Sequence, residues 1–97
     1  MTLTIDSIVT RSTQVMAQPV DDELVMMHLE SSQYLGLNPM GRRIWDMMES
    51  PISVQAICQQ LVTEFDVEMA VCEREVLAFL SDLHESQVVE LPADAEG

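Results

Sequence analysis

The sequence predicts an α+β fold in which a three-stranded antiparallel sheet is followed by three helices. Short apolar runs separated by polar turns occupy residues 14–37, whereas apolar residues recur at three- and four-residue steps from 39 to 86. A single domain is expected over residues 1–91, because 97 residues supply only one modest core. Residues 92–97 are expected to form a disordered tail.

Two adjacent runs, residues 24–29 and 33–37, are expected to form a hairpin. The first run is apolar except for His28 and has polar residues on both sides, which is typical of a short strand buried on much of both faces. In the second run Leu35 and Leu37 share one face of an extended chain. The polar residues between the two runs supply the turn.

The strand at 33–37 has only one obvious partner in the sequence. A weaker strand is predicted over residues 14–20, where Pro19 limits its length, and it would complete a meander. The strand at 33–37, with Tyr34 pointing outward, therefore ends the sheet. Its outer backbone donors and acceptors are left for another peptide to use.

Three helices are expected after the sheet. The first spans about 39–49, because the Asn38 side chain can cap it and Pro39 fits a first-turn position. Ser53 caps the second helix, and the third spans roughly 69–86. The apolar stripe of the third helix consists of Cys72, Val76, Phe79, Leu80 and Leu83. The apolar residues that follow this helix, at 88, 89 and 91, either cover a sheet edge or fray.

The net charge argues against a nucleic-acid partner. Seventeen acidic side chains stand against four arginines and no lysine, which gives a formal charge of −13. This charge opposes binding to a phosphate backbone and suits a basic peptide, although it can equally serve solubility alone. No apolar stretch approaches the length of a membrane span and no secretion signal is recognisable, so a cytoplasmic protein without a membrane partner is expected.

Catalytic and metal-binding patterns are hard to find in this sequence. His28 and His84 have no companion that would form a nucleophile and base pair. No glycine loop suited to phosphate is present. Cys58 and Cys72 fall on apolar helix stripes without a CxxC pattern, so they are expected to be buried free thiols. A binding module without cofactor or metal is therefore favoured over an enzyme.

The order of these signals resembles the PqqD-like family, small domains also called RiPP recognition elements. The resemblance covers about residues 20–91 and is carried by the segments DDELVMMHLE, SSQYLGLNPMGRRIW, SVQAICQQLVTEFDV and EREVLAFLSDLHESQVVE. It implies a winged-helix-like arrangement that binds the leader segment of a ribosomally made precursor peptide. The leader is then presented to a processing enzyme, such as a leader peptidase.

Two subfamilies and two further classes remain open. The stretch LESSQYLGLNPMGRRIW is closer to the stand-alone leader-binding proteins of lasso-peptide pathways than to the partner used in pyrroloquinoline quinone assembly. A winged-helix transcription factor or scaffold is the alternative class, and a stand-alone hydrolase is a distant third. Gln87 stands where the family usually has glycine, so the exit from the third helix needs a left-handed residue or a different shape.

The leader is expected to lie antiparallel along residues 32–37, in a groove beside the third helix. Val76 and Leu80 are either groove or core residues, whereas Leu77 is favoured as an exposed apolar contact at the margin of the stripe. A monomer or weak dimer is expected. The candidate peptide-binding residues are Ser32, Gln33, Tyr34, Leu35, Gly36, Leu37, Glu73, Val76, Leu77, Leu80 and Asp82, with Glu73 and Asp82 meeting a basic leader side chain.

Overall fold

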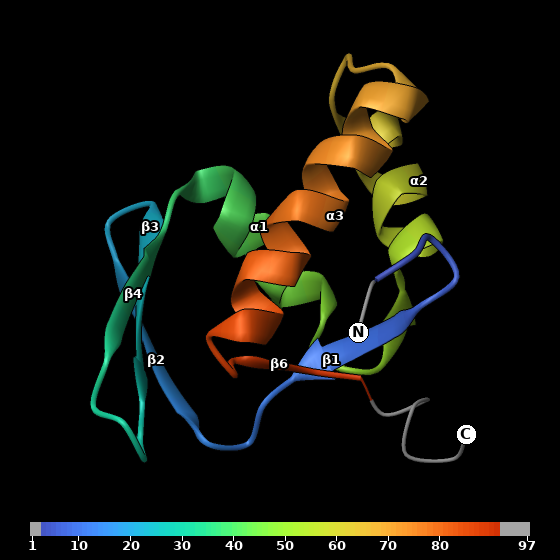
Figure 1. The fold of residues 1–97 in the computed structure, drawn as a ribbon. Helices are drawn as coiled ribbons and strands as arrows, with labels where there is room; N and C mark the ends of the chain where they lie inside the picture. Colours follow the sequence, from blue (N-terminus) through green and yellow to red (C-terminus); the bar gives the residue numbers. More distant parts are fainter. Residues whose placement is uncertain (1–2, 92–97) are drawn as a thin grey trace.

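The computed structural model describes residues 3–91, which form two small antiparallel sheets and three helices (Figure 1). The predicted α+β fold, with a three-stranded sheet before three helices, is confirmed. The expected disorder of 92–97 lies outside the described residues. The elements are β1 (Ile8–Arg11), β2 (Val15–Val20), β3 (Glu23–His28), β4 (Tyr34–Leu37), α1 (Pro39–Met47), β5 (Ile52–Ser53), α2 (Val54–Glu64), α3 (Met69–Glu85) and β6 (Val89–Glu90).

Strands β2, β3 and β4 form a meander, here called the hairpin sheet, in which β3 is central. Its helix-facing side is apolar because Leu24 and Met26 of β3 alternate with residues that point away, and both are buried. Leu37 of β4 lies opposite Leu24 and is buried as well. Helix α1 follows β4 directly, and all three helices lie on one side of the hairpin sheet (Figure 1).

The second sheet, with strand order β5-β1-β6, was not predicted from the sequence. Strand β1 is its centre, and Val9 of this strand is fully buried. Strand β6 pairs with β1, so the apolar residues after the third helix do cover a sheet edge, and Val88 and Val89 are buried. This sheet ties the start of the chain to the end of α3.

The predicted caps form at the first two helices. The Gly41 N–H donates to Asn38 Oδ1 at 2.8 Å, and the Ala56 N–H donates to the Ser53 hydroxyl at 3.0 Å. Gln87 leaves α3 with a φ of 65°, which is the left-handed residue that the missing glycine required. Within residues 3–91, no helix combines the length and the apolar character needed to cross a bilayer.

Candidate peptide-binding groove

Strand β4 is an edge of the hairpin sheet, because β3 is its sole partner among the described residues. The His28 N–H donates to the Gln33 carbonyl at 2.9 Å. The main-chain groups of Gln33 therefore point toward β3. Along an antiparallel pair, residues whose N–H and C=O point toward the partner strand alternate with residues whose N–H and C=O point away. The main-chain groups of Leu35 and Leu37 therefore also point toward β3. The N–H and C=O groups of Tyr34 and Gly36 therefore face the open side.

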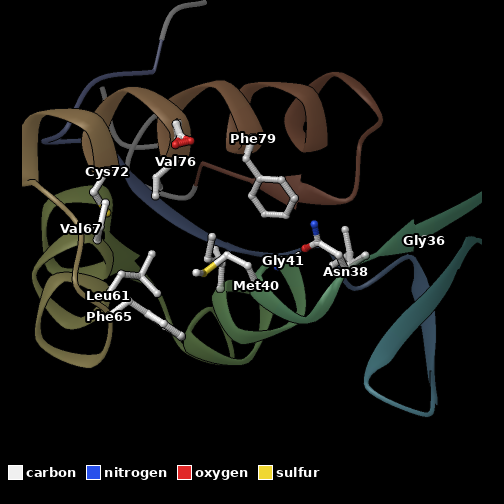
Figure 2. A pocket seen from close by; sticks show the side chains of 13 residues that line it. Gly36, Asn38, Met40, Gly41, Leu61, Phe65, Val67, Cys72, Val76 and Phe79 are labelled. Atoms are coloured by element: carbon white, nitrogen blue, oxygen red, sulfur yellow. Dashed lines mark hydrogen bonds between the residues drawn. The ribbon is translucent and has the colours of Figure 1, made fainter.

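A pocket of about 350 Å³ lies between the end of β4 and the helices (Figure 2). Phe79 and Val76 reach from α3 toward Met40 and Gly41 of α1, and Phe65 borders the pocket from the end of α2. Most of the lining is apolar. The lining residues are Gly36, Leu37, Asn38, Met40, Gly41, Ile44, Leu61, Phe65, Val67, Cys72, Glu75, Val76 and Phe79.

Gly41 brings the first turn of α1 close to α3. A Cβ atom at this position would stand 3.1 Å from Phe79 Cζ and 3.3 Å from Asn38 Oδ1, which is tighter than ordinary van der Waals contact. The glycine thus allows the Phe79 ring to lie against the capped helix start. The position of this ring, in turn, helps to define the wall of the pocket.

A second pocket of about 300 Å³ lies at the other end of β4. It is formed by the start of β4 and the segment that leaves α3, and its lining residues are His28, Gln33, Tyr34, Leu35, Ser86 and Val88. From Val76 to Ser86, α3 rises about 15 Å at 1.5 Å per residue. The four residues of β4 span about 13 Å. The two pockets thus lie at opposite ends of β4, within the reach of a short extended peptide, and these pockets with the β4 edge between them are here called the groove.

Glu75 is the carboxylate that lines the first pocket, and it is exposed. Arg43 Nε donates to Glu64 Oε1 at 2.9 Å, an ion pair that joins α1 to the end of α2. This hydrogen bond lowers the pKa of the Glu64 carboxyl and raises the pKa of the Arg43 guanidinium.

The two cysteines are buried free thiols, as predicted. Burial, reinforced by the adjacent Cys72, raises the pKa of Cys58 to about 12. His28 and His84 both line a third pocket, of about 460 Å³, together with Glu30 and Glu90. Across the part of the chain that the structure describes, no cluster of three or more His, Cys, Asp or Glu side chains is suited to a metal ion.

The structure brings most of the predicted strand residues together. Leu35 and Leu37 face the helices while Tyr34 is 74% exposed on the other face, which confirms the predicted alternation. Gln33 lines the second pocket just before the strand. Ser32 lies in the loop before β4 with a φ of 60°, so the extended segment is shorter than expected at this end.

The predicted residues of α3 divide into two groups. Val76 lines the first pocket although it is 3% exposed, whereas Leu80 is fully buried and belongs to the core. Leu77 and Glu73 line neither end of the groove, because they lie about 160° and 120° around the helix from Phe79. Leu77 packs, half-buried, against the core, and its expected contact with a bound leader is left to measurement. Asp82 lies about 60° from the pocket-facing direction and is exposed.

Three groove residues were missed by sequence reasoning. Phe79 was assigned to the core stripe, and it does pack against the core besides lining the first pocket. Met40 and Glu75 were given no role in binding. Spacing offered a signal, because residues three and four apart lie on the same side of a helix: Phe79 is three residues after Val76 and four after Glu75. The exposed fraction of Met40, 40%, depends on the position of α1 beside β4 and could not be read from the sequence.

Comparison with known proteins identifies the fold. The sequence profile of the family described as coenzyme PQQ synthesis protein D (PqqD) matches residues 23–89. The chain belongs to the PqqD family. No curated protein matches it.

Two solved structures share the PqqD fold seen here. One is described as TbiB1 in complex with the TbiA(beta) leader peptide: it is 31% identical, with a TM-score of 0.78, over 84% of this chain and 94% of that one. The other is described as lasso peptide synthetase B1 complexed with the leader peptide: it is 22% identical, with a TM-score of 0.76, over 84% of this chain and 96% of that one. At this lower identity, the second structure supports the fold alone.

Proposed function

We propose that this PqqD-family chain is a non-catalytic adaptor for lasso-peptide maturation. It binds the leader segment of a ribosomally synthesised precursor and delivers it to a processing enzyme such as a leader peptidase. The observation that carries this function is the open edge of β4 beside two pockets on the helix-facing side. The leader peptide in the complex of the 31% identical TbiB1 supports the same ligand class.

The leader adds to the hairpin sheet as a fourth strand. Its backbone pairs with the open N–H and C=O groups of Tyr34 and Gly36, which gives affinity with little dependence on sequence. Alternate side chains turn toward α3, and those near the two ends of β4 enter the two pockets. Because the strand spans about 13 Å, the anchoring side chains are about four residues apart. Glu75 and Asp82 favour a basic side chain near them.

A second assignment within the family is a peptide chaperone in pyrroloquinoline quinone biosynthesis. The description of the matching family supports it, since that description names coenzyme PQQ synthesis. The two assignments share the groove and the strand addition, and they differ in the precursor that is bound. The greater weight goes to the lasso pathway because the stretch LESSQYLGLNPMGRRIW is closer to the stand-alone leader-binding proteins of that pathway.

A displayed library of random peptides tests peptide binding even though the precursor is unidentified. Selection on the purified chain is expected to enrich peptides with two apolar residues about four positions apart, and the synthetic winners should bind saturably in fluorescence anisotropy. Mass spectrometry should find these peptides intact after long incubation, since the chain is not an enzyme. Salt-sensitive binding to duplex DNA, with no peptide enrichment, would instead support the winged-helix transcription factor.

The anisotropy measurement can be repeated with labelled leaders from a lasso precursor and from a pyrroloquinoline quinone precursor. Tighter binding of the lasso leader is expected, and the reverse order would assign the chain to the quinone pathway. We place this exchange in the cytoplasm, where ribosomes release the precursor.

A further inference from the structure

The third pocket lies at the corner where the end of the hairpin sheet meets the end of α3 and strand β6 (Figure 1). At about 460 Å³ it is larger than either pocket of the groove. Seven of its nine lining residues are polar or ionisable, whereas most of the first pocket is apolar. It is therefore suited to a polar ligand, and the proposed strand addition at β4 gives it no role.

Two buried polar side chains form the inner part of the third pocket. Ser12 and His28, at 8% and 6% exposure, are the buried polar residues of the described chain, and both line this pocket. Buried polar groups normally find their hydrogen-bond partners inside the protein. The meeting of these two at one cavity therefore indicates a place where a ligand supplies part of the hydrogen bonding.

Both side chains have a donor left over. The Ser12 hydroxyl oxygen accepts from the Gln14 N–H at 3.1 Å, and no described residue accepts the hydroxyl hydrogen. His28 Nδ1 accepts from the Glu30 N–H at 3.2 Å, so the neutral ring carries its proton on Nε2. Nε2 has no partner within residues 3–91, yet no sealed side-chain nitrogen or oxygen there lacks one. This atom therefore reaches the open space of the pockets that the ring borders.

The rim of the third pocket is acidic. Glu30 and Glu90 are exposed, and neither takes part in an ion pair within the described part of the chain. His84, half-buried, is the remaining ionisable residue of the lining. No arginine lines this pocket, and the chain contains no lysine. With a formal charge of −13 on the whole chain, the rim attracts a cationic group.

The inner donors and the rim acceptors together define the ligand. A bare metal ion is disfavoured because the inner groups present hydrogens to it, and a carboxylate is disfavoured by the acidic rim. A basic residue within a peptide satisfies both parts of the pocket. Its main-chain carbonyl accepts from His28 and Ser12, and its ammonium or guanidinium group reaches the carboxylates of Glu30 and Glu90.

The proposed course of the leader leads to this pocket. A leader antiparallel to β4 leaves the strand at the end where the second pocket lies. The His28 ring lines the second and third pockets alike. The exit from α3 separates them, because Ser86 and Val88 line the second pocket while Gln87 lines the third. Passing over this one segment moves a peptide about 10 Å, twice the spacing of neighbouring strands, or about three extended residues.

We propose that the third pocket binds a lysine or arginine of the precursor, about three residues C-terminal to the residue that occupies the second pocket. This inference rests on the proposed function and extends it past the strand. The contact gives a sequence selectivity that strand addition lacks. It also fixes the direction in which the rest of the precursor leaves the adaptor.

The test uses a peptide selected on the purified chain, in a short form and in extended forms. Each extension adds six serines after the second apolar anchor, and one serine at a time is replaced by arginine, or by glutamine as the uncharged control. Arginine at about the third position is expected to lower the Kd in anisotropy about tenfold relative to glutamine there. At the first and sixth positions the gain should stay below about twofold.

Charge variants locate the gain on the molecule. The double substitution Glu30→Gln and Glu90→Gln should abolish the arginine gain and keep the Kd of the short peptide within about twofold, because neither residue lines the groove. The matched control is Glu49→Gln with Glu68→Gln, which removes the same charge at two exposed positions outside all three pockets. This control should keep the gain.

Nuclear magnetic resonance supplies a readout that general charge attraction does not produce. The chain has two histidines, and His84 lines the third pocket but not the second. Its imidazole resonances should shift when the arginine peptide binds and stay in place with the short peptide. His28, which borders both pockets, should respond to both peptides.

Four results would overturn the inference while the short peptide still binds. The first is arginine no better than glutamine at every position. The second is a gain that the Glu30 and Glu90 variant keeps, or that the control loses equally, since overall charge would then be its source. The third is an unmoved His84 ring. The fourth is free arginine shifting His84 at the same concentrations as the extended peptide, which would assign the pocket to a small molecule. Failure of the short peptide to bind the wild type would instead refute the proposed function, and this inference with it.

Discussion

Replacing Gly36 with proline tests strand addition at a single hydrogen-bond donor. The Gly36 N–H faces the open side of β4, so proline removes a donor that the leader needs and leaves the ladder to β3 intact. The proline ring also occupies the space of the incoming strand. Proline is tolerated at a sheet edge in this orientation, and the extended residue before it already has a suitable conformation.

The expected loss follows from the groups involved. One backbone hydrogen bond contributes about 0.5–1.5 kcal/mol, and the blocked carbonyl of the leader adds a similar desolvation cost. Together these amount to about 2 kcal/mol, or roughly a thirtyfold rise in Kd at 1.4 kcal/mol per factor of ten.

Gly36→Ala is the matched control. A Cβ atom at Gly36 meets nothing within 4 Å, and the glycine does not have a positive φ. Alanine should therefore keep leader affinity and raise the free energy of unfolding by about 0.4–1 kcal/mol, because it restricts the unfolded chain.

Affinity is measured by anisotropy with a selected peptide, and folding is checked by circular dichroism and thermal melting. The reasoning is refuted if Gly36→Pro is folded and binds as tightly as the wild type. It is equally refuted if Gly36→Ala loses as much affinity as Gly36→Pro, because alanine retains the N–H group.

Three further predictions concern the groove wall, a buried thiol and an ion pair. Phe79→Ala should raise the Kd for a selected peptide by about tenfold, because Phe79 lines the first pocket. Leu77→Ala, at another half-buried position of α3, should leave this Kd unchanged. Equal effects of the two substitutions in anisotropy would contradict the assignment of the groove. Cys58, whose pKa is raised to about 12, should resist iodoacetamide at pH 8 in the folded protein and react once denatured, as followed by mass spectrometry. Because the pKa of Glu64 is lowered in the folded protein, its pair with Arg43 stabilises the fold above pH 4.5. This contribution is lost as the pH falls through the pKa that Glu64 has in the folded protein. Glu64→Gln should remove this part of the acid dependence of the melting temperature.

The sequence predicted those elements whose signal is local. The hairpin and the three helices follow from alternation, three- and four-residue spacing and caps at Asn38 and Ser53, and the observed bounds lie within one or two residues of the expected ones. Strands β5 and β6 contain two residues each, which is too short for any period to be visible. They form because β1 lies between them, and that contact joins segments far apart in the chain.

The edge strand of the groove was predicted, whereas the peptide-binding residues stay a prediction. The open edge of β4 followed from strand count, whereas the rotation of α3 about its own axis did not. A stripe of apolar residues fixes the core side of a helix only to within a wide arc, so spacing alone did not show that Phe79 lines a pocket besides packing against the core. The close approach of Phe79 to Gly41 places this ring between α3 and the start of α1, a contact that the spacing of α3 could not show.

The central position of β1 limits how the domain can be transplanted. The matched family region begins at residue 23, after β1 and β2, yet Val9 has no exposed surface and Leu3 has only 6%. A hybrid enzyme built by grafting residues 23–89 onto a foreign catalytic partner would strip β5 and β6 of their common neighbour and open the core to water. A graft of this domain should therefore carry the preceding segment along, from Leu3 onward.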